Sequence, residues 1–217
     1  MPDNVRVVPY DTSAAIRELS TARVWVDNCR KGAHVKKDGQ YYMQTWHGFA
    51  LKRIERDVAD KLNTPENAAY AEYAKRDSAQ IDAIISNSTF MTEIYQKSFW
   101  YHGAVLEYGS ARNDILVHPP ADAKHQVQQA LHLPNDCQII MYAPTFRADH
   151  SLDAYQLDYQ AVCRACAQRF GGNWVMLVRL HPNVMKLAKD LKFDNQTTFD
   201  ATSVDDMQLL LAGCDAV

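Results

Sequence analysis

Tyr41-Tyr42-Met43-Gln44-Thr45-Trp46-His47-Gly48 is the most informative segment of this chain. Its first residues predict a short strand, and the run Leu51-Lys52-Arg53-Ile54 behind it is basic and compatible with a helix. A histidine followed by glycine in a strand-to-helix turn occupies the place where α/β folds bind ligands. Gly48 lets a ligand approach the backbone, and the N-terminus of the following helix favours an anion. We therefore expect His47 to be a general base beside a phosphate site; the alternative is a histidine ring satisfied within its own turn.

Length and composition describe an ordinary globular protein. The chain has 217 residues, enough for one large or two small domains, with 47% apolar and 23% charged residues. A net charge of −3 argues against a general nucleic-acid-binding protein, so we expect no nucleic-acid partner. Residues 1–10 contain no apolar signal-peptide core, and no apolar run approaches the roughly 20 residues of a membrane span. Any contact with a bilayer is therefore expected to be peripheral.

The five cysteines have no framework spacing, which indicates reduced thiols in the cytosol. Cys163 and Cys166 are spaced as CxxC, but they fall in an expected amphipathic helix, 159–170, and no second pair follows. We expect two small apolar core residues rather than a zinc or redox site.

Four cations occupy the polar connection from Asn28 to Gly39: Arg30, Lys31, Lys36 and Lys37. They could meet an anionic ligand or lipid headgroups, but a solvated loop is the expected arrangement.

Strands alternate with helices along the chain, which predicts right-handed βαβ units and parallel sheets. The expected strands are 23–27, 41–45, 81–86, 105–108, 138–143 and 174–180. The expected helices are 13–21, 50–62, 65–80, 89–99, 121–133, 158–170, 184–191 and one from Ser203 or Asp205 to about 211. Pro119 and Pro120 interrupt the series after His118, so we expect domains of residues 1–118 and 119–217. Each series is short for a Rossmann-like domain, and residues 215–217 resemble a strand just beginning, so both domains are expected to be incomplete.

Seven polar residues lie directly after, or near the end of, an expected strand: His47, Arg112, Asn113, Thr145, Arg147, Arg179 and His181. This is the edge where open α/β sheets bind ligands, and arginine forks suit phosphate oxygens. Two such edges from opposite domains would form a cleft in which His47 and His181 face each other. Taken singly, each arginine is an ordinary surface charge and His181 an ordinary strand-end histidine.

The sequence contains neither an Asp-x-Asp pair nor a Walker-type glycine loop, and Asp205-Asp206 fits the start of a helix. Arginines and helix ends, rather than a metal held by the protein, are expected to neutralise a bound pyrophosphate. We expect no metal and no cofactor.

Four motifs, in order, are similar to those of a known family: Gln44-Thr45-Trp46-His47-Gly48, Gly109-Ser110-Ala111-Arg112-Asn113-Asp114, Tyr142-Ala143-Pro144-Thr145-Phe146-Arg147 and Arg179-Leu180-His181-Pro182. From about Arg23 to Val217 the chain resembles the CDP-glycerol glycerophosphotransferase family, the teichoic acid primases and polymerases. The resemblance implies a GT-B-like fold of two Rossmann-like domains, the first on the acceptor side and the second for the nucleotide donor. It also implies transfer of glycerol phosphate from CDP-glycerol to a hydroxyl of a teichoic-acid-type acceptor, with release of CMP.

The resemblance also implies roles for single residues. His47 would take the proton of the acceptor, and His181 would stabilise the pyrophosphate or protonate the leaving phosphate. Donor phosphates would be held by Gly48, Arg112, Asn113, Thr145, Arg147 and Arg179. The implied partners are CDP-glycerol or a related CDP-polyol and a lipid-linked polyol-phosphate acceptor, which places the protein in the cytoplasm, peripheral on the inner face of the membrane.

Three departures from the family pattern leave alternatives open. Phe49-Ala50 replaces Thr-Pro after His47, and Ala111 replaces proline before Arg112. The family's TDYSS motif, which handles the glycerol-phosphate end, would follow Val217. The alternatives are a CDP-ribitol or capsule polyol-phosphate transferase and, from another class, a non-catalytic nucleotide-binding fragment.

Overall fold

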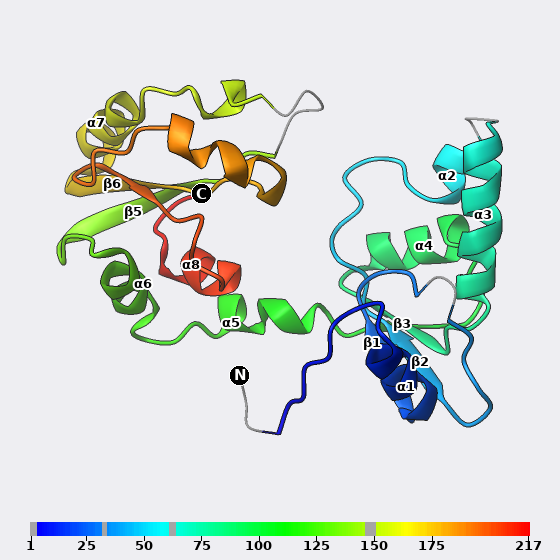
Figure 1. Ribbon diagram of the computed structural model, residues 1–217. Helices are drawn as coiled ribbons and strands as arrows, with labels where there is room; N and C mark the ends of the chain where they lie inside the picture. Colours follow the sequence, from blue (N-terminus) through cyan, green and yellow to red (C-terminus); the bar gives the residue numbers. More distant parts are fainter. Residues whose placement is uncertain (1–3, 32–33, 61–63, 146–150) are drawn as a thin grey trace. The chain divides into compact units, whose positions relative to one another are not determined.

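A computed structural model describes residues 4–31, 34–60, 64–145 and 151–217 of the chain (Figure 1). The chain divides into two compact units, Met1–Ala111 and Arg112–Val217. The division falls a few residues before His118, where the sequence places it, because the short helix α5 (Asp114–Val117) packs against α8 (Met207–Gly213) of the second unit.

Unit 1 is built on a parallel four-stranded sheet in the order β1-β2-β3-β4. Its strands are β1 (Val24–Asp27), β2 (Tyr41–Gln44), β3 (Ala83–Ser86) and β4 (Ala104–Glu107). Its helices are α1 (Ser13–Thr21), α2 (Arg56–Ala59), α3 (Pro65–Ser78) and α4 (Thr89–Ser98). Each of the three longer helices begins at a residue whose hydroxyl accepts a backbone N–H of the first turn: Thr12, Thr64 and Ser88. A mainly aromatic core of Trp25, Tyr42, Tyr95, Phe99 and Tyr101, together with Ile81, Ile84 and Met91, holds the sheet to its helices.

Unit 2 has three parallel strands in the order β5-β6-β7: β5 (Cys137–Tyr142), β6 (Asn173–Val178) and β7 (Thr198–Asp200). Besides α5 and α8 it contains α6 (Ala123–Leu131), α7 (Tyr159–Phe170) and the 3₁₀ segments η2 (Asp153–Tyr155) and η3 (Pro182–Asp190), while η1 (Ala111–Asn113) lies at the division. Val175 and Leu177 of β6 pack with α6 and α8, whereas Met176 and Val178 pack with residues of α7 and η3. The sheet is therefore covered on both faces, as Figure 1 shows.

The order of the strands creates a switch point at β5. The chain passes from β5 to β6 and β7 on one side, and then Ala216 forms a parallel bridge to Ile140 of β5. This bridge confirms the expected start of a strand near the end of the sequence. Open α/β sheets bind ligands beyond the carboxyl ends of strands at such a reversal. In this unit that place is the segment after Tyr142.

The expected α/β fold with two parallel sheets is confirmed, but several local predictions are wrong. Within the described residues 50–60 of the expected helix 50–62, only α2 is helical, because Glu55 takes a left-handed φ of 56° that an α-helix cannot contain; the end of that expected helix lies outside the described residues. Residues 184–190 of the expected helix 184–191 are 3₁₀ rather than α-helical, and the last helix is capped by Asp206. Strand β7 was not predicted, because its three residues are too few for a periodic signal.

The prediction of two core cysteines is confirmed for Cys163 alone: it is buried in the core beside β6, and burial raises the pKa of its thiol to about 11, whereas Cys166 is half-buried and not part of that cluster. Within the described ranges, no helix is at once long and apolar enough to cross a bilayer.

Asp194 organises the turn before β7 and provides a pH-dependent contribution to stability. Burial alone would raise its pKa, but hydrogen bonds from the backbone N–H groups of Gln196, Thr197 and Thr198, and from the Gln160 amide, hold that pKa well below its ordinary value. A carboxylate with a lowered folded-state pKa stabilises the fold above its unfolded value of about 3.9 and loses that effect as the pH falls toward the folded value.

We predict that Asp194→Asn lowers the free energy of unfolding at pH 7 by about 1 kcal/mol, an amount limited by solvent screening. The difference from the unsubstituted chain should shrink as the pH falls below about 4. Urea denaturation at several pH values measures it, with the exposed Asp60→Asn as a control that should change little. A deficit that stays constant down to acid pH would contradict this assignment.

Candidate active site

His47 lies in the turn after β2, and its ring is held from two sides. The Nδ1 atom is 2.8 Å from the carbonyl oxygen of Asn28, and the ring stacks on Trp46 with centroids 4.2 Å apart. A carbonyl oxygen can only accept, so in the neutral ring Nδ1 carries the proton and Nε2 keeps the lone pair. This is the tautomer of a base that acts through Nε2.

Buried Gln44 hydrogen-bonds both to Cys29, the neighbour of Asn28, and to Trp46, so it connects the two segments that hold the His47 ring. Its amide nitrogen donates to the carbonyl of Cys29 at 2.9 Å, and its amide oxygen accepts from the backbone N–H of Trp46 at 2.8 Å. The side chain of Asp27 accepts the backbone N–H groups of Asn28 and Cys29. The carbonyl that orients His47 therefore belongs to a segment fixed at both ends.

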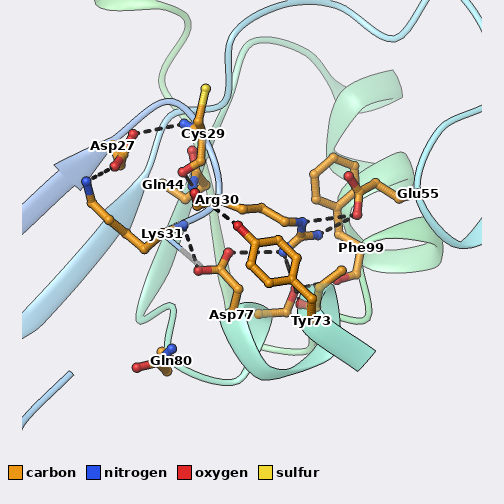
Figure 2. Close-up of polar contacts among 12 residues, drawn as sticks. Asp27, Cys29, Arg30, Lys31, Gln44, Glu55, Tyr73, Asp77, Gln80 and Phe99 are labelled. Carbon is orange, nitrogen blue, oxygen red and sulfur yellow. Dashed lines mark hydrogen bonds and ion pairs between the residues drawn. The ribbon is translucent and has the colours of Figure 1, made fainter. Parts of the chain in front are cut away.

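Arg30 is the centre of a buried charge cluster that the sequence did not predict, and Figure 2 shows its ion pairs with Glu55 and Asp77. We call Arg30, Glu55, Asp77, Ser78 and Tyr70 the Arg30 cluster. The guanidinium donates to Glu55 at 2.6 and 3.2 Å, and to Asp77 at 3.1 Å and Ser78 at 3.0 Å; the Tyr70 hydroxyl donates to Glu55 at 2.6 Å. The side chains of Arg30, Glu55 and Asp77 are 5%, 4% and 0% exposed.

The Arg30 cluster reaches the His47 turn through aromatic rings. The guanidinium lies 5.9 Å from the centre of the Trp46 ring and 5.5 Å from that of Phe99. Burial alone would lower the pKa of Arg30, but the hydrogen bonds and charges of Glu55 and Asp77 raise it, so the cation is retained. The Arg30 side chain therefore contacts the Trp46 ring, which stacks on His47, and anchors the loop that carries Asn28.

The expectation of a solvated loop is wrong for Arg30, Lys31 and Lys36, whose side chains are mostly buried in ion pairs, whereas Lys37 is exposed. Lys31 pairs with Asp27, Lys36 pairs with Asp82 at 2.5 Å, and Lys37 donates to the carbonyl of Ser20 at 3.3 Å. The missed signal is Asp77 in the last turn of α3, where the helix dipole disfavours an anion. A carboxylate at that position indicates a cation elsewhere in the fold.

A cavity of about 370 Å³ in unit 1 is lined by both Trp46 and His47. Its wall also includes Glu55 and Tyr70 of the Arg30 cluster and exposed Arg53. A second hollow, of about 340 Å³, lies among the N-terminal segment, α1 and β1, and contains none of the predicted site residues. Within the described parts of unit 1, the candidate base His47 therefore borders a cavity whose lining residues are known.

His181 in unit 2 follows β6 and has the opposite tautomer to His47. Its Nδ1 accepts the backbone N–H of Asn183 at 3.2 Å, which leaves the proton of a neutral ring on Nε2. Buried Tyr155 joins the two unit 2 motifs, because its hydroxyl donates to the carbonyl of Pro144 at 3.1 Å and accepts the backbone N–H of His181 at 3.0 Å. This tyrosine is not among the site residues that the sequence predicts.

The other predicted residues differ in what surrounds them. Thr145 is exposed just after β5, at the switch point, whereas Arg147 lies outside the described residues. Half-buried Arg179 donates to the carbonyls of Ala201, at 2.9 Å, and Val204, at 2.5 Å, which closes the turn after β7.

Arg112 is exposed and Asn113 half-buried, both in η1 after β4. A Cβ on Gly48 would meet nothing within 4 Å, so packing within the described residues does not require a glycine there. The anion site expected at a helix after His47 is absent from the described turn, because residues 49–54 are not helical. Unit 1 thus contributes His47 and the cavity, and unit 2 contributes Thr145 and His181.

Metal ligands form no group of three or more within the described ranges.

Comparisons with known proteins agree with this description. The family model of CDP-glycerol:poly(glycerophosphate) glycerophosphotransferase matches residues 1–217. A teichoic acid poly(glycerol phosphate) polymerase of Staphylococcus epidermidis is 30% identical over 99% of this chain and 31% of its own length. A teichoic acid glycerol-phosphate transferase of Staphylococcus aureus is 31% identical over 80% of this chain and 47% of its own length. The chain thus spans from about a third to about half of these two relatives.

Solved structures of the wall teichoic acid polymerase TagF are similar in fold. One of them matches 99% of this chain and 53% of its own, with a TM-score of 0.81 and 28% identity. Another, of a variant soaked with CDPG, matches 96% of this chain and 51% of its own, with a TM-score of 0.78 and 30% identity. These matches confirm the expected GT-B-like fold class.

Proposed function

Because the chain belongs to the CDP-glycerol:poly(glycerophosphate) glycerophosphotransferase family, we propose that it transfers glycerol phosphate from CDP-glycerol to a hydroxyl of a polyol-phosphate acceptor. The acceptor oxygen attacks the phosphorus that bears glycerol, the bond from that phosphorus to CMP breaks, and CMP leaves with the bonding electrons. The proton of the acceptor passes to Nε2 of His47. Unit 1 serves the acceptor, and unit 2 serves the nucleotide donor.

The observation that supports these roles is the pair of opposite tautomers. In the neutral state, a base needs a lone pair, and a group that stabilises a leaving phosphate needs a proton to donate. The Asn28 carbonyl leaves the lone pair of His47 on Nε2, and the Asn183 N–H leaves the proton of His181 on Nε2. The position of Thr145 at the switch point supports a donor site in unit 2. The facing of the two histidines across a cleft stays a prediction.

Arg112, Asn113, Arg147 and Arg179 remain proposed donor ligands. Arginine forks match phosphate oxygens in geometry and charge. For Arg179 the proposal also requires that it keep its bonds to Ala201 and Val204, so its contribution would come from the remaining N–H groups. We also place the protein at the inner face of the membrane, because the implied acceptor is lipid-linked; cell fractionation that finds it outside the cell would contradict this.

We predict that His181→Ala weakens CDP-glycerol binding and lowers kcat/KM for CDP-glycerol by roughly 10- to 100-fold, since it removes one hydrogen bond to a charged group. Release of CMP measures turnover, and calorimetric titration measures donor affinity. The matched control is His125→Ala, an exposed histidine of α6 whose ring contacts the side chain of Gln129. Donor binding unchanged in His181→Ala and lost in His47→Ala would reverse the assignment of the two units.

A further inference from the structure

The cavity beside His47 has a wall that is both polar and rigid. Glu55 contributes a carboxylate that is 4% exposed, and it is fixed by Arg30 on one oxygen and by Tyr70 on the other. Burial and the Glu55 carboxylate raise the pKa of Tyr70 to about 12, so its hydroxyl stays protonated at neutral pH. A carboxylate oxygen can accept more than one hydrogen bond, and a hydroxyl that donates can still accept. The wall therefore suits a ligand that carries hydroxyl donors.

Charge and size argue against a nucleotide in this cavity. A pyrophosphate would approach the negatively charged Glu55 carboxylate. Arg30 is already paired with that carboxylate, so it is not available to neutralise the ligand. The volume of about 370 Å³ lies near the lower end of small-molecule sites, which run from about 300 to 1,000 Å³. Arg53, exposed on the lining, provides a cation that suits one phosphate at the rim.

We propose that this cavity binds the terminal polyol-phosphate unit of the acceptor, with Glu55 and Tyr70 contacting its hydroxyls and Arg53 contacting its phosphate. This inference rests on the proposed function, because it places the attacking hydroxyl beside His47. Tyr70 and Glu55 become determinants of which polyol the acceptor ends in. Ile54, Val58 and Ala59, which also line the cavity, provide the apolar surface against which the carbon chain of the polyol lies.

The test is a pair of variants on one helix. Tyr70→Phe removes a hydroxyl from the cavity wall, whereas Tyr73→Phe removes one that donates to the Arg30 carbonyl at 3.4 Å and does not line the cavity. The probe is glycerophosphoglycerol, titrated into the 217-residue chain while NMR follows the Trp46 indole and His47 ring signals. We expect Tyr70→Phe to weaken probe binding roughly 3- to 10-fold and Tyr73→Phe to leave it unchanged.

Two results would overturn the inference: probe binding that is equally affected in both tyrosine variants, or competitive displacement of the probe by CDP-glycerol. The second would assign the cavity to the donor. In turnover, Tyr70→Phe should raise KM for the acceptor with little change in KM for CDP-glycerol. Failure of the proposed function would look different, since His47→Ala would then keep its CMP release while the probe still bound in a Tyr70-dependent manner.

Discussion

Replacing His47 with alanine is expected to lower kcat for CMP release by roughly 10²–10⁴-fold, the usual contribution of a general base. The affinity for CDP-glycerol should change little, because the ring is held by Asn28 and Trp46 and is proposed to act on the acceptor. A loss in kcat without a loss in donor affinity is the signature of an interaction made in the transition state.

The measurement is steady-state release of CMP, together with calorimetric titration of each variant with CDP-glycerol. His102→Ala, an exposed histidine of the same unit, provides the control and should keep full turnover. Activity in His47→Ala within a few-fold of the unsubstituted chain would exclude His47 as the base.

Replacing Arg30 with methionine is expected to lower the free energy of unfolding of unit 1 by about 3–5 kcal/mol. The variant leaves Glu55 and Asp77, whose side chains are 4% and 0% exposed, without their cation. Three of the four tryptophans, at positions 25, 46 and 100, lie in unit 1, so fluorescence in urea follows that unit.

The matched control is Arg56→Met, which breaks an exposed i,i+4 pair with Asp60 and should cost at most about 0.5 kcal/mol. Adding Glu55→Gln and Asp77→Asn to Arg30→Met should recover part of the loss, because no buried charge is then left unpaired. A loss as small as that of Arg56→Met would show that the Arg30 cluster contributes little to stability.

Local signals in the sequence predict those parts of the fold that depend on neighbouring residues. Ser88 and Asp158 mark the beginnings of α4 and α7, and the positive φ of Gly171 ends α7. His47 and His181 could be singled out for the same reason, since each lies a few residues beyond a clear strand.

The predictions that are wrong concern residues whose structure depends on contacts between segments far apart in sequence. Helix propensity favours 50–62. Glu55, however, is hydrogen-bonded to Arg30 and Tyr70, which lie 25 and 15 residues away in sequence, and its positive φ interrupts the helix at that position. The local sequence predicts a solvated charge for Arg30, because its anionic partners Glu55 and Asp77 lie 25 and 47 residues farther along the chain. Tertiary ion pairs of this kind override local propensity and leave only indirect traces, such as an acid at a helix C-terminus.

The protonation of the two histidines tests the division of roles most directly. Long-range ¹H–¹⁵N spectra of the ring nitrogens in mildly alkaline buffer distinguish a protonated from an unprotonated nitrogen, and spectra of His47→Ala and His181→Ala assign the signals. We predict that the neutral ring of His47 carries its proton on Nδ1 and that of His181 on Nε2. A proton on Nε2 of His47, with Nδ1 of His181 protonated, would contradict the roles of base and phosphate donor proposed for them.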